Sequence, residues 1–333
     1  MLRDNSRVQI IDINDSHAGQ RVDNFLLSKL KGVPKSRIYR LLRKGEVRVN
    51  KGRIKPCHKL LLGDQVRIPP IRTAISASTK IFTPNTRFMS LLENSVVYED
   101  RYLLVINKPS GLAVHGGSGI SSGLIECLRQ MRPQQHFLEL VHRLDKETSG
   151  CVMVAKKRSA LRHLQEQLRS GKITKIYHAL VAGCWSRQCL SIDQPLVKNQ
   201  LISGERIVKP AQINLPGVKQ SLTEYKIIKL YQHASLIEAK PITGRTHQIR
   251  VHCQFAGHPI VGDTKYGNDT VNKKFHSMGL KRLFLHAFRL EFTLPGSTEA
   301  VTAAASHAGD AKIIVEAPFD DKLTAICKQL TMP

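Results

Sequence analysis

An aspartate flanked by two cations lies near the middle of the chain. Asp145 has Arg143 two residues before it and Lys146 directly after it. Nearby positive charge favours the ionised form of a carboxyl group, so Asp145 is expected to be charged. An ionised carboxylate can serve as a nucleophile or as a general base. The alternative is a structural turn in which Asp145 only pairs with a neighbouring cation, because such ion pairs also occur away from active sites.

Asp145 belongs to a longer motif. The nine residues 142–150 read His-Arg-Leu-Asp-Lys-Glu-Thr-Ser-Gly, and an apolar, strand-like run follows at 151–155. This motif resembles the active-site signature of the large-subunit ribosomal RNA pseudouridine synthases. Lys175-Ile176-Tyr177 resembles a second motif of that family, and residues 241–252 resemble a third. The matching stretches cover residues 20–70 and residues 96 to about 295.

The resemblance implies an activity and a set of site residues. The expected reaction is the isomerisation of uridines to pseudouridine in 23S ribosomal RNA, with Asp145 as the catalytic carboxylate. The family pattern implies that Tyr177 stacks on the target base and that Arg245 pairs with Asp145. It also implies that Arg143 enters the space that the base vacates. The expected substrate-binding residues are Arg143, Tyr177, Arg245, Ile249 and Lys108.

The expected reaction needs no cofactor. It breaks the N1–C1′ bond of uridine and rejoins the same atoms through C5, so no nucleotide cofactor or redox partner is required, and none is expected. A metal site is not expected either, because His247 and His252 are five residues apart and do not share a helical face as zinc ligands would. A glycosidase would use a second carboxylate. Glu147 and Asp263 are candidates for it, but neither matches a catalytic position of the family.

Two other functions remain open from the sequence. The chain could be a pseudouridine synthase that acts on transfer RNA, or a catalytically silent RNA-binding factor in ribosome assembly. Asp145, Tyr177 and Arg245 are all intact, which argues against a silent protein.

The composition is that of a strongly basic globular protein. The chain has 333 residues, with 51 Lys and Arg against 26 Asp and Glu, so its net charge is +25. Such an excess indicates a polyanionic partner, and nucleic acid is the commonest. No stretch reaches the ~18 apolar residues of a membrane span, and the N-terminus lacks an apolar signal region, so a cytoplasmic protein is expected. The seven cysteines are scattered without a Cys-x-x-Cys pair, which suits reduced thiols. Nothing indicates oligomerisation, so a monomer is expected.

Basic residues gather near the N-terminus on one segment with helical spacing. Val22 to Leu30 reads as a helix that ends at Gly32 and Pro34, and Ser36 can cap a second helix. The second helix carries no acid to balance its cations, so it presents either a solvated face or an anion-binding face. Two helices and a small sheet resemble the S4 RNA-binding domain, which implies RNA contacts from this helix. The expected RNA-binding residues are Lys35, Arg37, Arg40, Arg43 and Lys44.

The elements that position the site form a larger second domain. We expect an S4-like domain at 20–82, a linker at 83–95 and a pseudouridine synthase domain at 96–330. Strand-like and helical segments are mixed along this domain, so the predicted class is α+β. The resemblance implies a mixed, mainly antiparallel sheet flanked by helices. The glycine-rich stretch 116–123 lacks the Gly-Lys-Ser/Thr ending of a nucleotide-binding loop. Residues 295–316 are expected to form an exposed loop.

Overall fold

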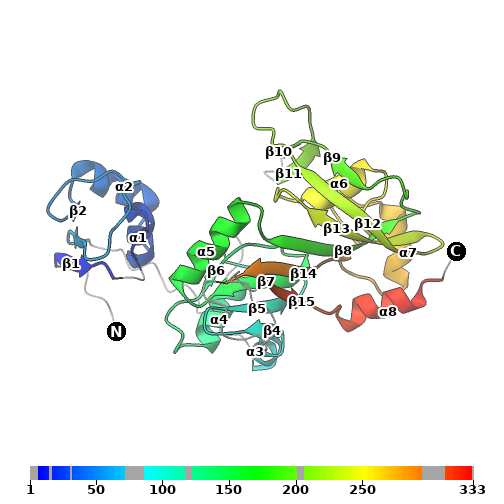
Figure 1. Cartoon of the computed structure of the whole chain (residues 1–333), viewed down its shortest axis with the longest axis horizontal. Coiled ribbons are helices and arrows are strands. Elements are labelled where there is room, and N and C mark those ends of the chain that lie inside the picture. Colours follow the sequence, from blue (N-terminus) through cyan, green and yellow to red (C-terminus); the bar gives the residue numbers. More distant parts are fainter. Residues whose placement is uncertain are drawn as a thin grey trace, which may run out of the picture. The chain divides into compact units, whose positions relative to one another are not determined.

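The structure is a computed structural model that describes residues 7–14, 17–30, 32–71, 86–116, 122–200, 206–294 and 312–331. The chain divides into two compact units, residues 1–83 and 84–333 (Figure 1). Most of the predicted glycine-rich stretch and most of the predicted loop at 295–316 lie outside the described residues. No helix in the described part of the chain is both long and apolar enough to cross a membrane.

The smaller unit packs two helices on a three-stranded antiparallel sheet of order β1-β3-β2. Phe25 and Leu26 of the first helix, and Ile38 and Leu42 of the second, are buried against Val66 of the central strand. The apolar residues that predicted the two helices therefore form their packed faces. The elements are β1 (Gln9–Asp12), α1 (Val22–Lys29), α2 (Lys35–Lys44), β2 (Arg48–Val49) and β3 (Gln65–Ile68).

Helix α2 begins and ends at residues that the sequence marks. Pro34, not Ser36, is its N-cap residue, because proline fixes an extended backbone before the first turn without a side-chain cap. The helix ends at Gly45, whose φ of 70° is left-handed and is easiest for glycine. Between these ends the apolar side is buried and the basic side faces solvent.

The larger unit is built on a mixed sheet of ten strands among the described residues. The main order is β4-β5-β7-β14-β8-β13-β12-β9, with β6 added to β7 and β15 added to β14. Strands β7 and β14 are parallel, and the other pairs recorded for this sheet are antiparallel, as expected. The strands are β4 (Val96–Glu99), β5 (Leu103–Lys108), β6 (Glu139–Leu140), β7 (Ser149–Ala155), β8 (Thr174–Ala182), β9 (Ser191–Asp193), β12 (Leu222–Leu230), β13 (Ala234–Pro241), β14 (Leu285–Thr293) and β15 (Lys312–Glu316).

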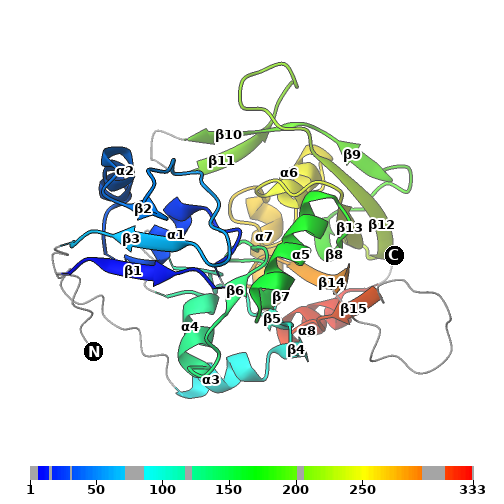
Figure 2. The ribbon, with the colours of Figure 1, turned by 60° about the vertical axis from the view of Figure 1, so that its left-hand side comes forward.

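Helices cover this sheet, and a separate hairpin lies beside it. The hairpin pairs β10 (Leu196–Gln200) with β11 (Arg206–Pro210), and it packs near α6 (Figures 1 and 2). The helices are α3 (Thr86–Glu93), α4 (Leu124–Met131), α5 (Arg158–Arg169), α6 (Gln248–Phe255), α7 (Asp269–Ser277) and α8 (Asp321–Gln329).

Alternate side chains of β5 contact different helices on the two faces of the sheet. Leu104 and Ile106 of β5 pack with α4, whereas Leu103 and Val105 pack with Leu164 of α5. Successive side chains of a strand point to opposite faces, so α4 and α5 cover opposite faces of this part of the sheet. This packing holds β7 in place, and the motif of Asp145 lies at the start of β7.

The interval 83–95, predicted to be a linker, is helical in its described part. Helix α3 occupies residues 86–93, and its Leu92 is fully buried among residues of β5, β7 and α4. The polar composition of this stretch concealed a short amphipathic pattern, with Phe88 and Leu92 four residues apart. These two side chains attach α3 to the core of the larger unit.

Candidate active site

The motif of Asp145 borders a pocket of about 590 Å³. Three segments form its walls: the turn before β7, the start of β8 with the end of α5, and the turn from β13 into α6. Asp145 is the only acidic residue among the lining residues. The lining cations are Arg143, Arg169, Lys175, Arg245 and Arg250. A single carboxylate therefore faces a surplus of positive charge, which suits a phosphate-bearing ligand.

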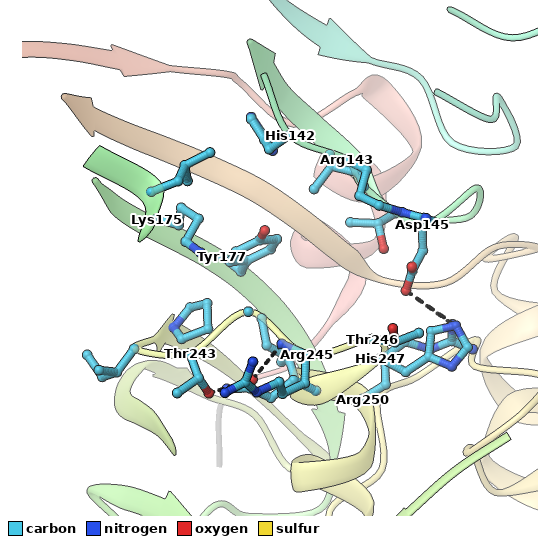
Figure 3. A pocket seen from close by; sticks show the side chains of 18 of the residues that line it. His142, Arg143, Asp145, Lys175, Tyr177, Thr243, Arg245, Thr246, His247 and Arg250 are labelled. Carbon is cyan, nitrogen blue, oxygen red and sulfur yellow. Dashed lines mark hydrogen bonds and ion pairs between the residues drawn. The ribbon is translucent and has the colours of Figure 1, made fainter. Parts of the chain in front are cut away.

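Two side chains from the last wall approach the carboxylate of Asp145. Nε2 of His247 lies 3.6 Å from Oδ2, and Nη1 of Arg250 lies 3.7 Å from the same oxygen. Figure 3 shows the ring of His247 directed at Asp145. The side chain of Asp145 is 25 % exposed, so it is accessible from the pocket. Both distances are longer than a hydrogen bond, and the charge of Arg250 is near enough to attract the carboxylate.

Arg250 is held by a second carboxylate behind it. Its Nε and Nη2 donate to Oδ2 and Oδ1 of Asp263 at 2.7 and 2.8 Å. Burial acts against the charge of Arg250, but the hydrogen bonds and charge of Asp263 outweigh it and raise the pKa of the guanidinium. Burial also acts to raise the pKa of Asp263, and the hydrogen bonds from Arg250 outweigh it and lower that pKa. The pair is therefore ionised, and Asp263 is not available as a catalytic acid.

The expected ion pair between Arg245 and Asp145 is absent from the described residues. Arg245 lines the pocket, but its Nε donates to the carbonyl of Gln220 at 3.0 Å, and its side chain lies away from Asp145 (Figure 3). The backbone amide of Arg245 is tied to Oε1 of Gln248 at the start of α6. This link keeps Arg245 in the exposed turn, while Arg250, inside the helix, points at the carboxylate. In this structure the guanidinium of Arg245 therefore bonds the carbonyl of Gln220, and its pairing with Asp145 stays a prediction.

Tyr177 and Ile249 both line the pocket, as the sequence predicted. Tyr177 lies on β8 and packs with apolar residues on both sides of it. Burial raises the pKa of its phenol above the usual range, so the ring is neutral. Ile249 is 6 % exposed on α6. The two side chains give the pocket an aromatic surface and an apolar wall, which suit a flat, uncharged base.

Arg143 is exposed at the edge of the pocket, next to the half-buried His142. The amide of Met153 donates to Nε2 of His142 at 3.1 Å, which fixes that ring against β7. Burial lowers the pKa of His142 to about 4, so the ring stays neutral near pH 7. His142 thereby anchors the loop, and Arg143 is left free to reach into the pocket.

Lys108 was predicted to bind substrate, but it does not line the pocket. Its side chain is fully buried, and Nζ donates to the carbonyls of Pro109, Leu112 and Lys146 at 2.8–3.0 Å. Strand β5 pairs with β7, so a side chain at the end of β5 lies beneath the loop that carries Asp145. Lys108 therefore holds this loop from behind. Burial lowers its pKa to about 7.

The basic side of α2 in the smaller unit is where the sequence placed it. Arg40, Arg43, Lys35 and Lys44 are exposed, and Arg37 is half-buried. No residue of the helix is acidic. These cations remain predicted RNA contacts.

Sequence reasoning missed the roles of His247, Arg250, Asp263 and Tyr266. His247 and Arg250 belong to the third motif, but only the start of α6 decides which side chains point inward. Asp263 was weighed only as a second catalytic carboxylate, and Tyr266, which lies near it in Gly-Asp-Thr-Lys-Tyr-Gly, was given no role. Across the described ranges, no three His, Cys, Asp or Glu side chains gather closely enough to hold a metal ion.

Comparison with known protein families gives two matches. Residues 102–255 match the family described as RNA pseudouridylate synthase, and residues 20–66 match the S4 domain. The chain is 52 % identical over 318 residues to "Ribosomal large subunit pseudouridine synthase C" of Pasteurella multocida, with 96 % of each chain covered. It is 51 % identical over 325 residues to the protein of the same name in Escherichia coli strain K12, with 97 % of each chain covered.

Solved structures show the same resemblance. "Human RNA Pseudouridylate Synthase Domain Containing 4" superposes with a TM-score of 0.58 at 25 % identity, over 74 % of this chain and 97 % of that one. "Human RNA Pseudouridylate Synthase Domain Containing 1" gives a TM-score of 0.52 at 27 % identity, over 76 % and 100 % of the two chains. Each match covers about three quarters of this chain.

Proposed function

Because the chain belongs to the RNA pseudouridylate synthase family and carries an S4 domain, we propose that it converts uridines of large-subunit ribosomal RNA to pseudouridine, with Asp145 as the reacting carboxylate. The relatives that are about 52 % identical over nearly the whole chain bear the name of a large-subunit enzyme, which supports this RNA as substrate. The net charge of +25 and the basic helix α2 support a long polyanionic substrate.

One observation carries the proposal: Asp145 is the only acidic group among the residues that line a cationic pocket. The reaction breaks the N1–C1′ bond of uridine and forms a C5–C1′ bond. The hydrogen on C5 leaves as a proton, and N1 gains one, so atoms and charge balance without a cofactor. The carboxylate is the group in this pocket that can act as the nucleophile or base of such a reaction.

The other lining residues have matching tasks. The target uridine must leave its stack, which costs a few kcal/mol. Tyr177 offers an aromatic ring for stacking, which returns about 1–3 kcal/mol per base. Ile249 packs behind the base, and the exposed Arg143 occupies the gap left in the RNA. The surplus of lining cations holds the adjacent phosphates.

The test is a map of pseudouridine in large-subunit ribosomal RNA from cells that lack the protein. Specific sites should lose pseudouridine and regain it with the intact gene, but not with an Asp145→Asn copy. Asp145→Asn removes the charge and keeps the size of the side chain, so the purified variant should still bind the RNA. Full activity of this variant would contradict the role of Asp145. An unchanged map of ribosomal RNA would contradict the substrate and direct the search to transfer RNA.

A further inference from the structure

His247 occupies an unusual backbone position in the pocket wall. Its φ of 53° and ψ of 18° are left-handed, and it is the residue directly before α6. Among the described residues other than glycine, Asn50, Lys51 and His247 have a positive φ. Such backbone is unfavourable for a residue with a Cβ and is often found where a side chain must be aimed. Here it turns the imidazole toward Asp145 while the helix that begins next carries Arg250.

The ring nitrogen of His247 that lies away from Asp145 has a hydrogen-bond partner of its own. Nδ1 lies 2.8 Å from the hydroxyl oxygen of Tyr266, and this oxygen accepts a hydrogen bond of 3.0 Å from the amide of Val208 in β11. A carboxylate only accepts hydrogen bonds, so a proton on Nε2 of the neutral ring suits Asp145, and Nδ1 can then accept from the hydroxyl of Tyr266. Burial lowers the pKa of His247 despite the opposing charge of Asp145, and Arg250 and Lys265 add to the lowering.

The two oxygens of Asp145 are not equivalent. Both His247 and Arg250 approach Oδ2, at 3.6 and 3.7 Å. Oδ1 accepts no hydrogen bond from the residues that the structure describes, although the side chain borders the pocket. Two nitrogens therefore lie on the side of Oδ2, and Oδ1 is the oxygen without such neighbours among the described residues. Catalytic hydrogen bonds are often long before the substrate binds and shorten in the complex.

We propose that His247 is a positioning residue, which directs its Nε2–H at Oδ2 of Asp145 and so leaves Oδ1 to meet the uridine. This role rests on the proposed function, because it takes Asp145 as the reacting carboxylate. His247 acts together with Arg250, which supplies the permanent charge, while His247 supplies a directional donor. Tyr266 and β11 hold the ring at the required angle.

A matched pair of substitutions tests the donor. His247→Gln keeps an N–H near the place of Nε2 and an oxygen that can accept from Tyr266, whereas His247→Met keeps the bulk and has no donor. Both variants have a Cβ, so the left-handed backbone is equally unfavourable in each. The substrate is a transcript of large-subunit ribosomal RNA with tritium at C5 of uridine. Isomerisation replaces the C5–H bond, so the tritium released in a single turnover measures the rate, and filter binding measures the Kd.

We expect His247→Met to lower the single-turnover rate by about 30- to 100-fold, as small misplacements of reacting groups do. The Kd should stay within about twofold of the wild-type value, because the lost interaction is not with RNA. His247→Gln should recover the rate to within about fivefold of wild type. His276→Met, an exposed histidine of α7 outside the pocket, is the control for histidine removal.

Three results overturn the inference. These are an unchanged rate for His247→Met, an equal loss in the Gln and Met variants, and a loss that appears only as a weaker Kd. The rate of the wild-type enzyme shows whether the positioning role or the proposed function has failed. A wild-type enzyme without activity on this RNA contradicts the substrate, whereas an active wild type beside an equally active His247→Met contradicts only the positioning role.

Discussion

Arg250 connects two carboxylates: it grips Asp263 through two hydrogen bonds and directs its remaining Nη1 at Asp145, 3.7 Å away. The guanidinium is 8 % exposed, so it is largely removed from water. A buried carboxylate without a cation would strongly destabilise the folded protein. Arg250 neutralises Asp263 and also attracts Asp145. The arginine that approaches Asp145 therefore comes from inside α6 and not from the turn before it.

Exchange of each arginine for lysine tests this assignment. Arg250→Lys keeps a positive charge for Asp263, so the protein should fold, but lysine cannot bridge both carboxylates. We expect the single-turnover rate to fall by about 100-fold, because Asp145 loses its orientation. Arg245→Lys, in the same motif, should change this rate by less than about fivefold. A larger loss of rate in Arg245→Lys than in Arg250→Lys would show that Arg245 pairs with Asp145 during the reaction.

Tyr177 should act through its ring and not through its hydroxyl. The phenol is neutral because burial raises its pKa, and its oxygen has no hydrogen-bond partner among the described residues. Tyr177→Phe is therefore expected to keep kcat/KM within about fivefold of the wild-type value. Tyr177→Leu should lower kcat/KM by about 5- to 150-fold, which is the equivalent of the ~1–3 kcal/mol that stacking contributes. Steady-state release of tritium from C5 measures both. Equal losses in the two variants would assign the hydroxyl a part in the reaction.

Lys108 should give the stability of the protein a particular dependence on pH. Burial lowers its pKa from 10.5 to about 7 in the folded protein. Between these values the unfolded chain binds more protons at this site than the folded one, so the contribution of Lys108 to the free energy of unfolding rises with pH. The limiting slope is about 1.4 kcal/mol per pH unit.

The measurement compares urea unfolding of the wild type and Lys108→Met from pH 6.5 upward. The free energy of unfolding of the wild type, minus that of the variant, should increase as the pH rises through ~7 toward ~10. Lys328→Met, an exposed lysine of α8, serves as the control and should show no such trend. If the free energy of unfolding depends on pH in the same way in the wild type and in Lys108→Met, the three carbonyls keep the pKa of Lys108 near its ordinary value.

Local patterns sufficed for most of the fold. The apolar spacing in α1 and in α2 belongs to one short segment each, so the sequence predicts these helices directly. Asp145 of the central motif, Tyr177 of the second motif and Ile249 of the third line one pocket. Helix α3 was missed because only two apolar residues, Phe88 and Leu92, attach it to the core.

The partner of Asp145 could not be chosen from the sequence. The sequence predicted Arg245, but Arg250 is five residues away in the same motif and carries the same charge, so charge alone does not distinguish them. The choice depends on the left-handed turn at His247, which ends the loop and aims the next residues inward. It also depends on Asp263, which lies 13 residues beyond Arg250 in sequence and meets it only in the folded chain. Long-range pairing of this kind leaves no periodic signal.

The basic helix of the smaller unit should contribute to RNA binding through phosphates. Arg40 and Arg43 are exposed on α2, which has no acidic residue, so each can contact a phosphate without breaking an ion pair within its helix. Arg40→Gln and Arg43→Gln should each weaken binding to ribosomal RNA and make the slope of log K against log salt shallower by about 0.7. Lys328→Gln is the matched control in the larger unit. A filter-binding series over salt concentration measures these slopes, and an unchanged slope in both α2 variants would identify that side of the helix as a solvated surface.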